Sequence, residues 1–331
     1  MRIIFMGTPD FAAETLRALV GAGYEVVLAV TQPDRPKGRH GAPVKSDVRV
    51  LAESCGIPVI TPERIRTDAE AKDRMRALAP DVIVVTAFGQ ILPEDVLSIP
   101  RFGCINVHAS LLPKYRGAAP VQWAVLNGDA ESGVTTMMMD AGLDTGDILE
   151  QCTVALDPRE TGGSLFLKLQ KAGGELIVHT LRRLEEGTLT RTPQDPALAT
   201  KVGQFRKTSG RIDWCKDAAV IERMIRGLDP WPSAFSSLNG KTVKLWDADV
   251  IYDDDPAQLK KASELKLRPA GHLGDPADMV LPDGTHPGDL FTDGRQLLVR
   301  CGTGTLRINE LQMEGRKRMH AEDFLKGYRF D

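Results

Sequence analysis

Hydrophobic residues in the first half of the chain form short unbroken runs, separated by segments in which apolar positions recur at helical spacing. Such runs are typical of strands buried on both faces of a parallel sheet, and the segments between them are typical of crossover helices. We expect strands at 3–7, 26–30, 58–60, 81–88 and 105–109, and helices at 11–20, 46–55, 68–78 and 119–127. Strands at 133–139 and 148–156 and a long helix at 164–186 would complete this α/β unit.

The pattern changes after Gly187. Residues 188–207 show little periodicity and contain Pro193 and Pro196, which is typical of a linker. A helix at 218–227 then precedes short strand-like runs. Turn signals separate these runs at Asn239-Gly240, Asp283-Gly284 and Asp293-Gly294. The sequence therefore predicts a domain of mostly parallel sheet with helices on both faces at 1–187, a linker at 188–207 and a small β-barrel at 208–331.

Composition adds limits to this picture. A chain of 331 residues exceeds the size at which one core keeps growing, so two domains are expected. The net charge of −3 argues against a protein that coats nucleic acid or anionic membrane with its whole surface. The apolar run after Met1 is too short for a signal-peptide core. Five scattered cysteines without a Cys-x-x-Cys pair indicate reduced thiols, so we expect a cytoplasmic protein that does not insert into membranes.

The strand expected at 105–109 carries the densest chemistry. Side chains alternate along a strand, so Asn106 and His108 point to one face with their Cα atoms roughly 7 Å apart. An amide that donates hydrogen bonds and an imidazole that carries a proton could hold one small reacting group between them. The alternative is that both residues only form the polar end of a strand.

Two neighbouring segments could complete a site. Residues 110–113 follow the strand at its carboxyl end, where open parallel sheets bind ligands, and they either pack in the core or form the wall of a pocket. Residues 140–147 combine three aspartates with two glycines and are also expected near the carboxyl end of a strand, at the same sheet edge. Their carboxylates either cap the N–H groups of a tight turn or approach His108, where a carboxylate would favour the protonated imidazole and fix its orientation.

Asn106, His108 and one of these carboxylates suit the transfer of an acyl group to an amine. A tetrahedral oxyanion needs hydrogen-bond donors, and the attacking amine must lose a proton that a carboxylate or its water can accept. The sequence has no G-x-S-x-G motif and no cysteine with an evident base. We therefore expect direct transfer without a covalent acyl-enzyme.

Nicotinamide, flavin and metal cofactors are not expected. The first loop reads Gly7-Thr8-Pro9 instead of G-x-G-x-x-G, and Pro9 lacks an N–H group that a pyrophosphate would need. Cys104 and His108 would lie about 13 Å apart on a strand, which is too far for both to bind one metal ion.

Residues 34–45 form a basic segment rich in Gly and Pro. It is either a solvated surface loop or a loop that contacts phosphate groups beside a ligand site.

Taken together, these segments resemble the folate-dependent formyltransferases. The elements that carry the resemblance occur in order and at the spacing of the family: Asn106-x-His108, Ser110-Leu-Leu-Pro113, Arg116-Gly117 and Asp144. Other motifs resemble those members whose acceptor is initiator methionyl-tRNA: residues 6–11, 32–36, 140–147, 211–214 and 230–232. The resemblance covers nearly the whole chain.

The resemblance implies a Rossmann-like catalytic domain, a carboxyl-terminal barrel of the oligonucleotide-binding type that assists tRNA binding, and 10-formyltetrahydrofolate as formyl donor. Asn106, His108 and Asp144 occupy the catalytic positions. The folate-binding positions are taken by Ser110, Leu111, Leu112, Pro113, Phe88, Gln90, Ile91, Leu92 and Asp140. Arg39, Lys37 and Lys207 match segments that lie near the tRNA. A monomer that formylates the α-amino group of methionyl-initiator tRNA for translation initiation is the implied protein.

Two other functions stay open. A formyltransferase of this kind could act on a small amine, such as an amino-sugar nucleotide or glycinamide ribonucleotide, although the β-rich second domain, the basic segment and residues 140–147 favour tRNA. A non-catalytic folate or RNA binding module is the other alternative, and the presence of Asn106, His108 and Asp144 argues against it.

Overall fold

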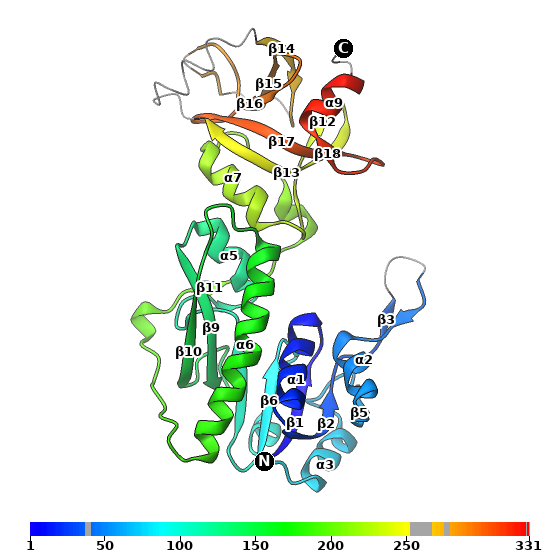
Figure 1. The fold of residues 1–331 in the computed structure, drawn as a ribbon, viewed down its shortest axis with the longest axis vertical. Coiled ribbons are helices and arrows are strands. Elements are labelled where there is room, and N and C mark those ends of the chain that lie inside the picture. Colours follow the sequence, from blue (N-terminus) through cyan, green and yellow to red (C-terminus); the bar gives the residue numbers. More distant parts are fainter. Residues whose placement is uncertain (37–40, 252–266, 275–278, 282, 329, 331) are drawn as a thin grey trace. The chain divides into compact units, whose positions relative to one another are not determined.

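The computed structural model describes residues 1–36, 41–251, 267–274, 279–281, 283–328 and 330. Its chain divides into two compact units that are not continuous in the sequence (Figure 1). The first unit comprises Met1–Val121, Ala130–Leu156 and Ser164–Gly203. The second unit comprises Gln122–Asp129, Asp157–Gly163 and Gln204–Asp331.

The first unit is built on a seven-stranded sheet with the order β10-β9-β7-β6-β1-β2-β5. The parallel strands are β1 (Arg2–Gly7), β2 (Glu25–Val30), β5 (Val59–Ile60), β6 (Val82–Thr86) and β7 (Cys104–His108). Two antiparallel strands extend the sheet beyond β7, namely β9 (Glu131–Met138) and β10 (Ile148–Ala155). The predicted mostly parallel sheet is confirmed.

One face of this sheet is covered by α3 (Ala69–Ala77) and α4 (Glu94–Leu97). Ile4 and Met6 of β1 belong to a buried cluster with Met75 of α3 and Val96 of α4. Alternate residues of a strand point to opposite faces, so Cys104, which belongs to the same cluster, places Asn106 and His108 on this side of β7 as well.

The opposite face is covered by α1 (Asp10–Gly21) and α6 (Gly162–Glu185). Gly173 and Gly174 lower the helix propensity of α6, yet the helix is continuous through them. A Cβ atom at Gly173 would lie 3.1 Å from Cγ1 of Val107, and one at Gly174 would lie 3.0 Å from Cβ of Ala18 in α1. The two glycines therefore allow α6 to pack closely against β7 and α1.

Shorter elements complete the first unit. α2 (Asp47–Ser54) begins after Ser46, whose Oγ accepts a hydrogen bond from the Arg49 N–H at 3.1 Å, as expected for an N-cap. α5 (Pro120–Asn127) begins in the first unit and continues into the second. The remaining strands are β3 (Arg35–Pro36), β4 (Pro43–Val44), β8 (Arg116–Gly117) and β11 (Lys201–Val202), and a 3₁₀ turn η1 covers Pro196–Leu198.

After α6 the chain runs back along the first unit, and we call residues 192–203 the return segment. The N–H of Ile148 donates to the Thr192 carbonyl at 2.8 Å, which ties the segment to β10. Further along, β11 pairs in parallel with β8. The return segment is therefore bonded to β8, which follows β7 in the chain, and to β10, which follows β9.

The second unit contains an antiparallel sheet with the order β12-β13-β17-β16-β15-β14, and β18 pairs with β17. Its strands are β12 (Ala234–Leu238), β13 (Lys241–Ile251), β14 (Arg268–His272), β15 (Asp289–Thr292), β16 (Leu297–Arg300), β17 (Thr305–Met313) and β18 (Met319–His320). A backbone hydrogen bond of 2.8 Å from the N–H of Gly274 to the Ser237 carbonyl links the chain after β14 to β12, the opposite edge. The expected β-barrel domain is thus a curled antiparallel half-barrel.

A hydrophobic core fills the concave side of this half-barrel. Ile221 and Ile225 of α7 (Ala218–Gly227) pack in it with Leu245 of β13 and Phe324 of α9 (Ala321–Gly327). The 3₁₀ turn η2 (Lys207–Gly210) leads into the sheet. Within the described part of the chain, no helix combines the length and apolarity that crossing a bilayer requires.

Candidate active site

Asn106 and His108 lie in the carboxyl-terminal half of β7. Their side chains are on the face of the strand that does not pack against α6. Val107, which lies between them in the sequence, contacts the α6 face instead. His108 is 7% exposed, and Asn106 is partly exposed. The strand geometry that the sequence suggested for the two side chains is present.

The two ring nitrogens of His108 face different groups. Nε2 lies 3.0 Å from the carbonyl oxygen of Tyr115, and a carbonyl can only accept a hydrogen bond, so Nε2 carries hydrogen. Nδ1 lies 3.8 Å from Oδ2 of Asp144, which is an ion-pair distance and too long for a hydrogen bond. Nδ1 is therefore the nitrogen available for exchanging a proton with a substrate or the carboxylate.

Asp144 is the aspartate of residues 140–147 that approaches His108. Its Oδ2 also accepts a hydrogen bond of 2.8 Å from the N–H of Gly117, and its side chain is 13% exposed. The backbone φ of Asp144 is +53°, in the left-handed region. A carboxylate shared between a backbone N–H and an imidazole is well placed to orient the ring.

The route by which Asp144 reaches His108 differs from the expected one. The sequence suggested a loop at the same sheet edge as the end of β7. Because β9 runs antiparallel to β7, Met138 pairs with Ile105 and Thr135 pairs with His108. The loop after β9 therefore starts beside the amino-terminal half of β7, and it turns back along the strand to bring Asp144 to His108.

Residues 110–113, the expected wall of a ligand pocket, follow β7 directly and are held by hydrogen bonds from the sheet. The Thr135 Oγ1 of β9 donates to the Ser110 carbonyl at 2.7 Å and accepts from the Leu112 N–H at 3.1 Å. The Gln151 Nε2 of β10 donates to the Leu112 carbonyl at 2.8 Å. The Ser110 hydroxyl donates to the Lys114 carbonyl at 2.7 Å, so it closes the turn and does not face a ligand.

Leu111 and Pro113 are the partly exposed members of this wall, whereas Ser110 and Leu112 are buried. Thr135 and Gln151 were not singled out in the sequence, because a threonine and a glutamine on strands give no signal of a positioning role. Only the hydrogen bonds reveal what they hold.

The turn at 88–92 contributes mainly backbone and one apolar side chain. Phe88 and Leu92 are buried, whereas Ile91 is 70% exposed. The Gln90 side chain accepts from the Ile65 N–H at 2.8 Å and donates to the Pro62 carbonyl at 3.2 Å. Its amide is thus occupied by the neighbouring segment, so a ligand at this turn would meet the backbone and Ile91.

Asp140 caps its own loop. Its Oδ1 accepts from the Gly142 N–H at 3.0 Å and from the Thr145 hydroxyl at 2.7 Å. The turn-capping alternative considered for residues 140–147 therefore describes Asp140, whereas Asp144 is the residue beside His108.

Other groups near the motif do not suggest a nucleophile or a metal site. Burial raises the pKa of the Cys104 thiol to about 12, which keeps it protonated and unreactive. Among the described residues, no group of three or more His, Cys, Asp or Glu side chains could hold a metal ion.

The residues suggested for tRNA contact are placed only in part. Lys37 and Arg39 lie outside the described residues. Lys207 is the exposed first residue of η2 in the second unit.

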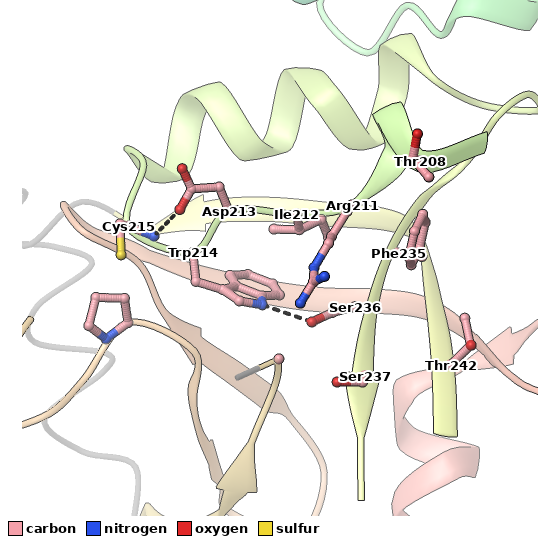
Figure 2. A pocket seen from close by; sticks show the side chains of 12 residues that line it. Thr208, Arg211, Ile212, Asp213, Trp214, Cys215, Phe235, Ser236, Ser237 and Thr242 are labelled. Carbon is pink, nitrogen blue, oxygen red and sulfur yellow. Dashed lines mark hydrogen bonds between the residues drawn. The ribbon is translucent and has the colours of Figure 1, made fainter. Parts of the chain in front are cut away.

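A cavity of about 720 Å³ lies in the second unit, and its lining does not include Asn106, His108 or Asp144 (Figure 2). In Figure 2 the Trp214 indole N–H donates to the Ser236 hydroxyl at 3.0 Å, and the Asp213 carboxylate accepts from the Cys215 N–H at 3.1 Å. Among the described residues that line the cavity none is a histidine, and the Asp213 carboxylate caps a turn.

Comparison with known proteins gives a consistent result. Residues 1–181 match the family described as formyl transferase, and residues 204–329 match the formyl transferase C-terminal domain. A methionyl-tRNA formyltransferase of Lachnospira eligens is 48% identical over 328 residues, which cover 99% of this chain and 96% of that protein. One from Geobacter metallireducens is 47% identical over 332 residues, with 100% and 97% covered.

A solved structure shares the fold at low sequence identity. It is an N-formyltransferase from Helicobacter canadensis in complex with folinic acid and dTDP-3-aminofucose, with a TM-score of 0.62 and 17% identity. The match covers 96% of this chain and 99% of that chain.

Proposed function

Because this chain belongs to the formyl transferase family, among its methionyl-tRNA formyltransferases, we propose that the site at Asn106, His108 and Asp144 formylates the free α-amino group of methionyl-initiator tRNA. The protein is an enzyme, a formyltransferase that serves translation initiation. The single observation that carries the site assignment is the approach of Asp144 Oδ2 to His108 Nδ1 at 3.8 Å, on the side of β7 that also holds Asn106.

The formyl donor in this proposal is 10-formyltetrahydrofolate. The groups around the site fit a flat heterocycle with hydrogen-bonding edges, because the turn at 88–92 offers backbone and the exposed Ile91, and residues 110–113 offer the partly exposed Leu111 and Pro113. Asp140 stands at the start of the same loop as Asp144. Folinic acid, a folate derivative, is bound in the related Helicobacter canadensis structure.

The chemistry is a direct acyl transfer. The amino nitrogen forms a bond with the formyl carbon, and the bond between that carbon and N10 of the donor then breaks. In between, the formyl oxygen carries negative charge, which the Asn106 amide and a protonated His108 stabilise; each such donor contributes on the order of 3 kcal/mol to lowering the barrier.

Proton transfer makes a smaller demand on the site. An α-amino group titrates at about 8, so a useful fraction is already neutral near pH 7. Asp144 keeps the imidazole oriented and, with its water, accepts the proton that the amine loses. The donor nitrogen takes up a proton as it leaves, so the charge balance closes.

The division of labour along the chain belongs to the same proposal. Residues 1–187 carry the chemistry, residues 188–207 join the two domains, and residues 208–331 assist tRNA binding. Lys37, Arg39 and Lys207 contact phosphate groups of the tRNA, which their positive charge suits. The enzyme acts as a cytoplasmic monomer.

Formyl transfer to defined acceptors tests the substrate assignment. Purified protein with 10-formyltetrahydrofolate should convert methionyl-initiator tRNA to the formylated form, and should leave an amino-sugar nucleotide and glycinamide ribonucleotide unmodified under the same conditions. Turnover of a small amine without turnover of the tRNA would replace the proposed acceptor. No turnover with any acceptor would favour a binding module.

Substitution Asn106→Ala tests the oxyanion role. Loss of one oxyanion donor lowers kcat by roughly 10² to 10³, whereas the KM for either substrate changes little because the contact strengthens only in the transition state. Steady-state kinetics give both constants. A rise in KM at normal kcat would assign Asn106 to ground-state binding instead.

A further inference from the structure

One side chain of the return segment bridges the two segments that position His108 and Asp144. The Gln194 Oε1 accepts hydrogen bonds from Arg116 Nε at 3.0 Å and from Arg116 Nη2 at 2.8 Å. Its Nε2 donates to the carbonyl oxygen of Asp144 at 2.9 Å and to that of Gly146 at 2.7 Å. Gln194 is thus bonded directly to the backbone of the residue that faces His108.

These contacts use the full capacity of a glutamine amide. A guanidinium only donates and a carbonyl only accepts, so the orientation of the Gln194 amide is determined by its neighbours. Both Nε2 hydrogens and both Oε1 lone pairs have partners. A glutamate of the same shape could accept from Arg116 but could not donate to the two carbonyls.

Within the described part of the chain, the loop that Gln194 holds has few other hydrogen bonds to its surroundings; they include those from the Gly117 N–H to Asp144 Oδ2 and from the Met138 N–H to the Asp147 carbonyl. Residues 140–143 are exposed, and the Asp140 carboxylate bonds only within the loop, to Gly142 and Thr145. Asp144 has a φ of +53°, a conformation that costs a non-glycine residue on the order of 1 kcal/mol unless its surroundings impose it. The bond from Gln194 to the carbonyl of Asp144 itself is one such constraint.

The return segment also supports the opposite side of the imidazole. Thr200 Oγ1 accepts from the Tyr115 N–H at 2.8 Å, and the Thr200 carbonyl accepts from the Arg116 N–H at 2.8 Å. The Tyr115 carbonyl is the group that faces Nε2 of His108. One stretch of chain therefore holds the partner of Nε2 and the partner of Nδ1.

We propose that Gln194 is a positioning residue of the formyl-transfer site, which holds Asp144 against His108, and that buried Arg116 supports it from the other side. This inference rests on the proposed function, because it matters for rate only if Asp144 takes part in the reaction. Gln194 itself touches neither His108 nor the reacting groups.

The test compares Gln194→Glu and Gln194→Met with the unaltered enzyme in formyl transfer to methionyl-initiator tRNA. Misplacing a catalytic group by about 1 Å costs up to roughly 100-fold in rate, so both variants should lose about 10- to 100-fold in kcat with KM values within a few-fold. Gln194→Glu keeps the side-chain shape and can still accept from Arg116. The decrease in its kcat therefore reports on the two hydrogen bonds that Gln194 donates to the loop. Normal kcat in both variants would overturn the proposal.

A double-mutant cycle separates positioning from general destabilisation. If Gln194 acts through Asp144, adding Gln194→Met to Asp144→Asn should cause little further loss, because the group it positions is already disabled. Equal fractional losses in both backgrounds would show that Gln194 acts independently of Asp144 and would contradict the proposal.

Gln170→Met is the matched control. The Gln170 Nε2 also donates to a backbone carbonyl, that of Asp10 at 2.8 Å, and its variant should keep normal kcat.

The single variants of the double-mutant cycle also distinguish the proposed role of Asp144 from the proposed role of Gln194. Near-normal activity of Asp144→Asn alone would refute the proposed role of Asp144, whereas a slow Asp144→Asn with a normal Gln194→Met would refute only the role of Gln194.

Discussion

The two loops that flank the Asn106–His108 pair are held in different ways. Residues 110–113 are bonded to Thr135 and Gln151, which stand on the strands β9 and β10 of the central sheet. In residues 140–147, the Asp147 carbonyl accepts from the Met138 N–H of β9, but the carbonyls of Asp144 and Gly146 are bonded by Gln194 of the return segment, which is not a strand of that sheet. The wall proposed for the folate is thus bonded directly to the sheet, while the carboxylate proposed for proton transfer stands on a part of its loop that the return segment holds.

This contrast separates two kinds of defect. Weakening the sheet contacts of residues 110–113 should affect donor binding and folding stability first. Weakening the anchors of residues 140–147 should affect the chemical step first, because they determine where Asp144 stands relative to His108.

Among the variants that probe this contrast, Gly146→Ala on the loop side should have the largest effect. A Cβ atom at Gly146 would collide with the backbone carbonyl oxygen of Met138, so the chain must shift beside Asp144. Since Gly146 also accepts a bond from Gln194, the shift should break that anchor. We expect kcat to fall roughly 10- to 100-fold in steady-state formyl transfer, with KM for the donor changed less.

Gly21→Ala is the control for this variant. Apart from its chain neighbours and the backbone of its own helix, no described atom lies within 4 Å of a Cβ built at Gly21, so the kcat of this variant should be normal. If the Gly146→Ala enzyme had a normal kcat and a raised donor KM, residues 140–147 would serve folate binding. They would then not differ in function from residues 110–113.

On the wall side, Thr135→Val should weaken donor binding and stability. The buried hydroxyl serves both the Ser110 carbonyl and the Leu112 N–H, and an unsatisfied buried group costs about 1–3 kcal/mol. The donor KM should rise several-fold with a smaller change in kcat, and the urea midpoint of unfolding should fall. Thr135→Ser, which keeps the hydroxyl, should retain most of the donor affinity; equal defects in both variants would point to packing instead.

The smallest effect is expected outside the site, at Glu150 of β10. Burial alone would raise the pKa of Glu150, but hydrogen bonds from Thr180, His179 and Arg183 outweigh it and hold the pKa below the ordinary value. The Glu150 carboxylate therefore stabilises the folded protein fully at pH values above the pKa of an unfolded glutamate, about 4.3. This contribution to the free energy of unfolding is lost as the pH falls through the lower pKa that Glu150 has in the folded protein.

Thermal unfolding of Glu150→Gln across pH measures this contribution. The unaltered protein should exceed the variant in Tm by a few degrees at pH 7, and the gap should close below about pH 4. A gap that persists unchanged in acid would show that the carboxylate charge is not the stabilising feature. Formyl transfer at pH 7 should be nearly unaffected in the variant. Among the described residues, the Glu150 side chain bonds to His179, Thr180 and Arg183 and to none of residues 110–113 or 140–147.

The features of the fold and the site that depend on local periodicity could be predicted from the sequence. Unbroken apolar runs located the buried strands, and the alternation of side chains placed Asn106 and His108 together. The proximity of Asp144 to His108 was also predicted, on the ground that its loop starts at the same sheet edge. This ground was wrong, because β9 runs antiparallel to β7 and the loop has to turn back along the strand. Strand direction depends on long-range pairing, which no local pattern records.

Other features had no local signal at all. Gln194 lies in a stretch without periodicity, and its importance comes from a bond to residues about fifty positions earlier in the chain. The assignment of Gln122–Asp129 to the second unit likewise depends on distant packing, because a Cβ at Gly227 of α7 would lie 3.0 Å from Leu126. Such contacts are set by the assembled fold.

In the proposed mechanism, Asp144 acts on His108 during formyl transfer. The measurement for this role is the single-turnover rate of Asp144→Asn with saturating 10-formyltetrahydrofolate and methionyl-initiator tRNA. Asparagine keeps an oxygen that can accept from the Gly117 N–H but removes the charge facing Nδ1. We predict a rate lower by about 10² or more, as expected for loss of acid–base assistance. A rate within a few-fold of the unaltered enzyme would contradict the claim.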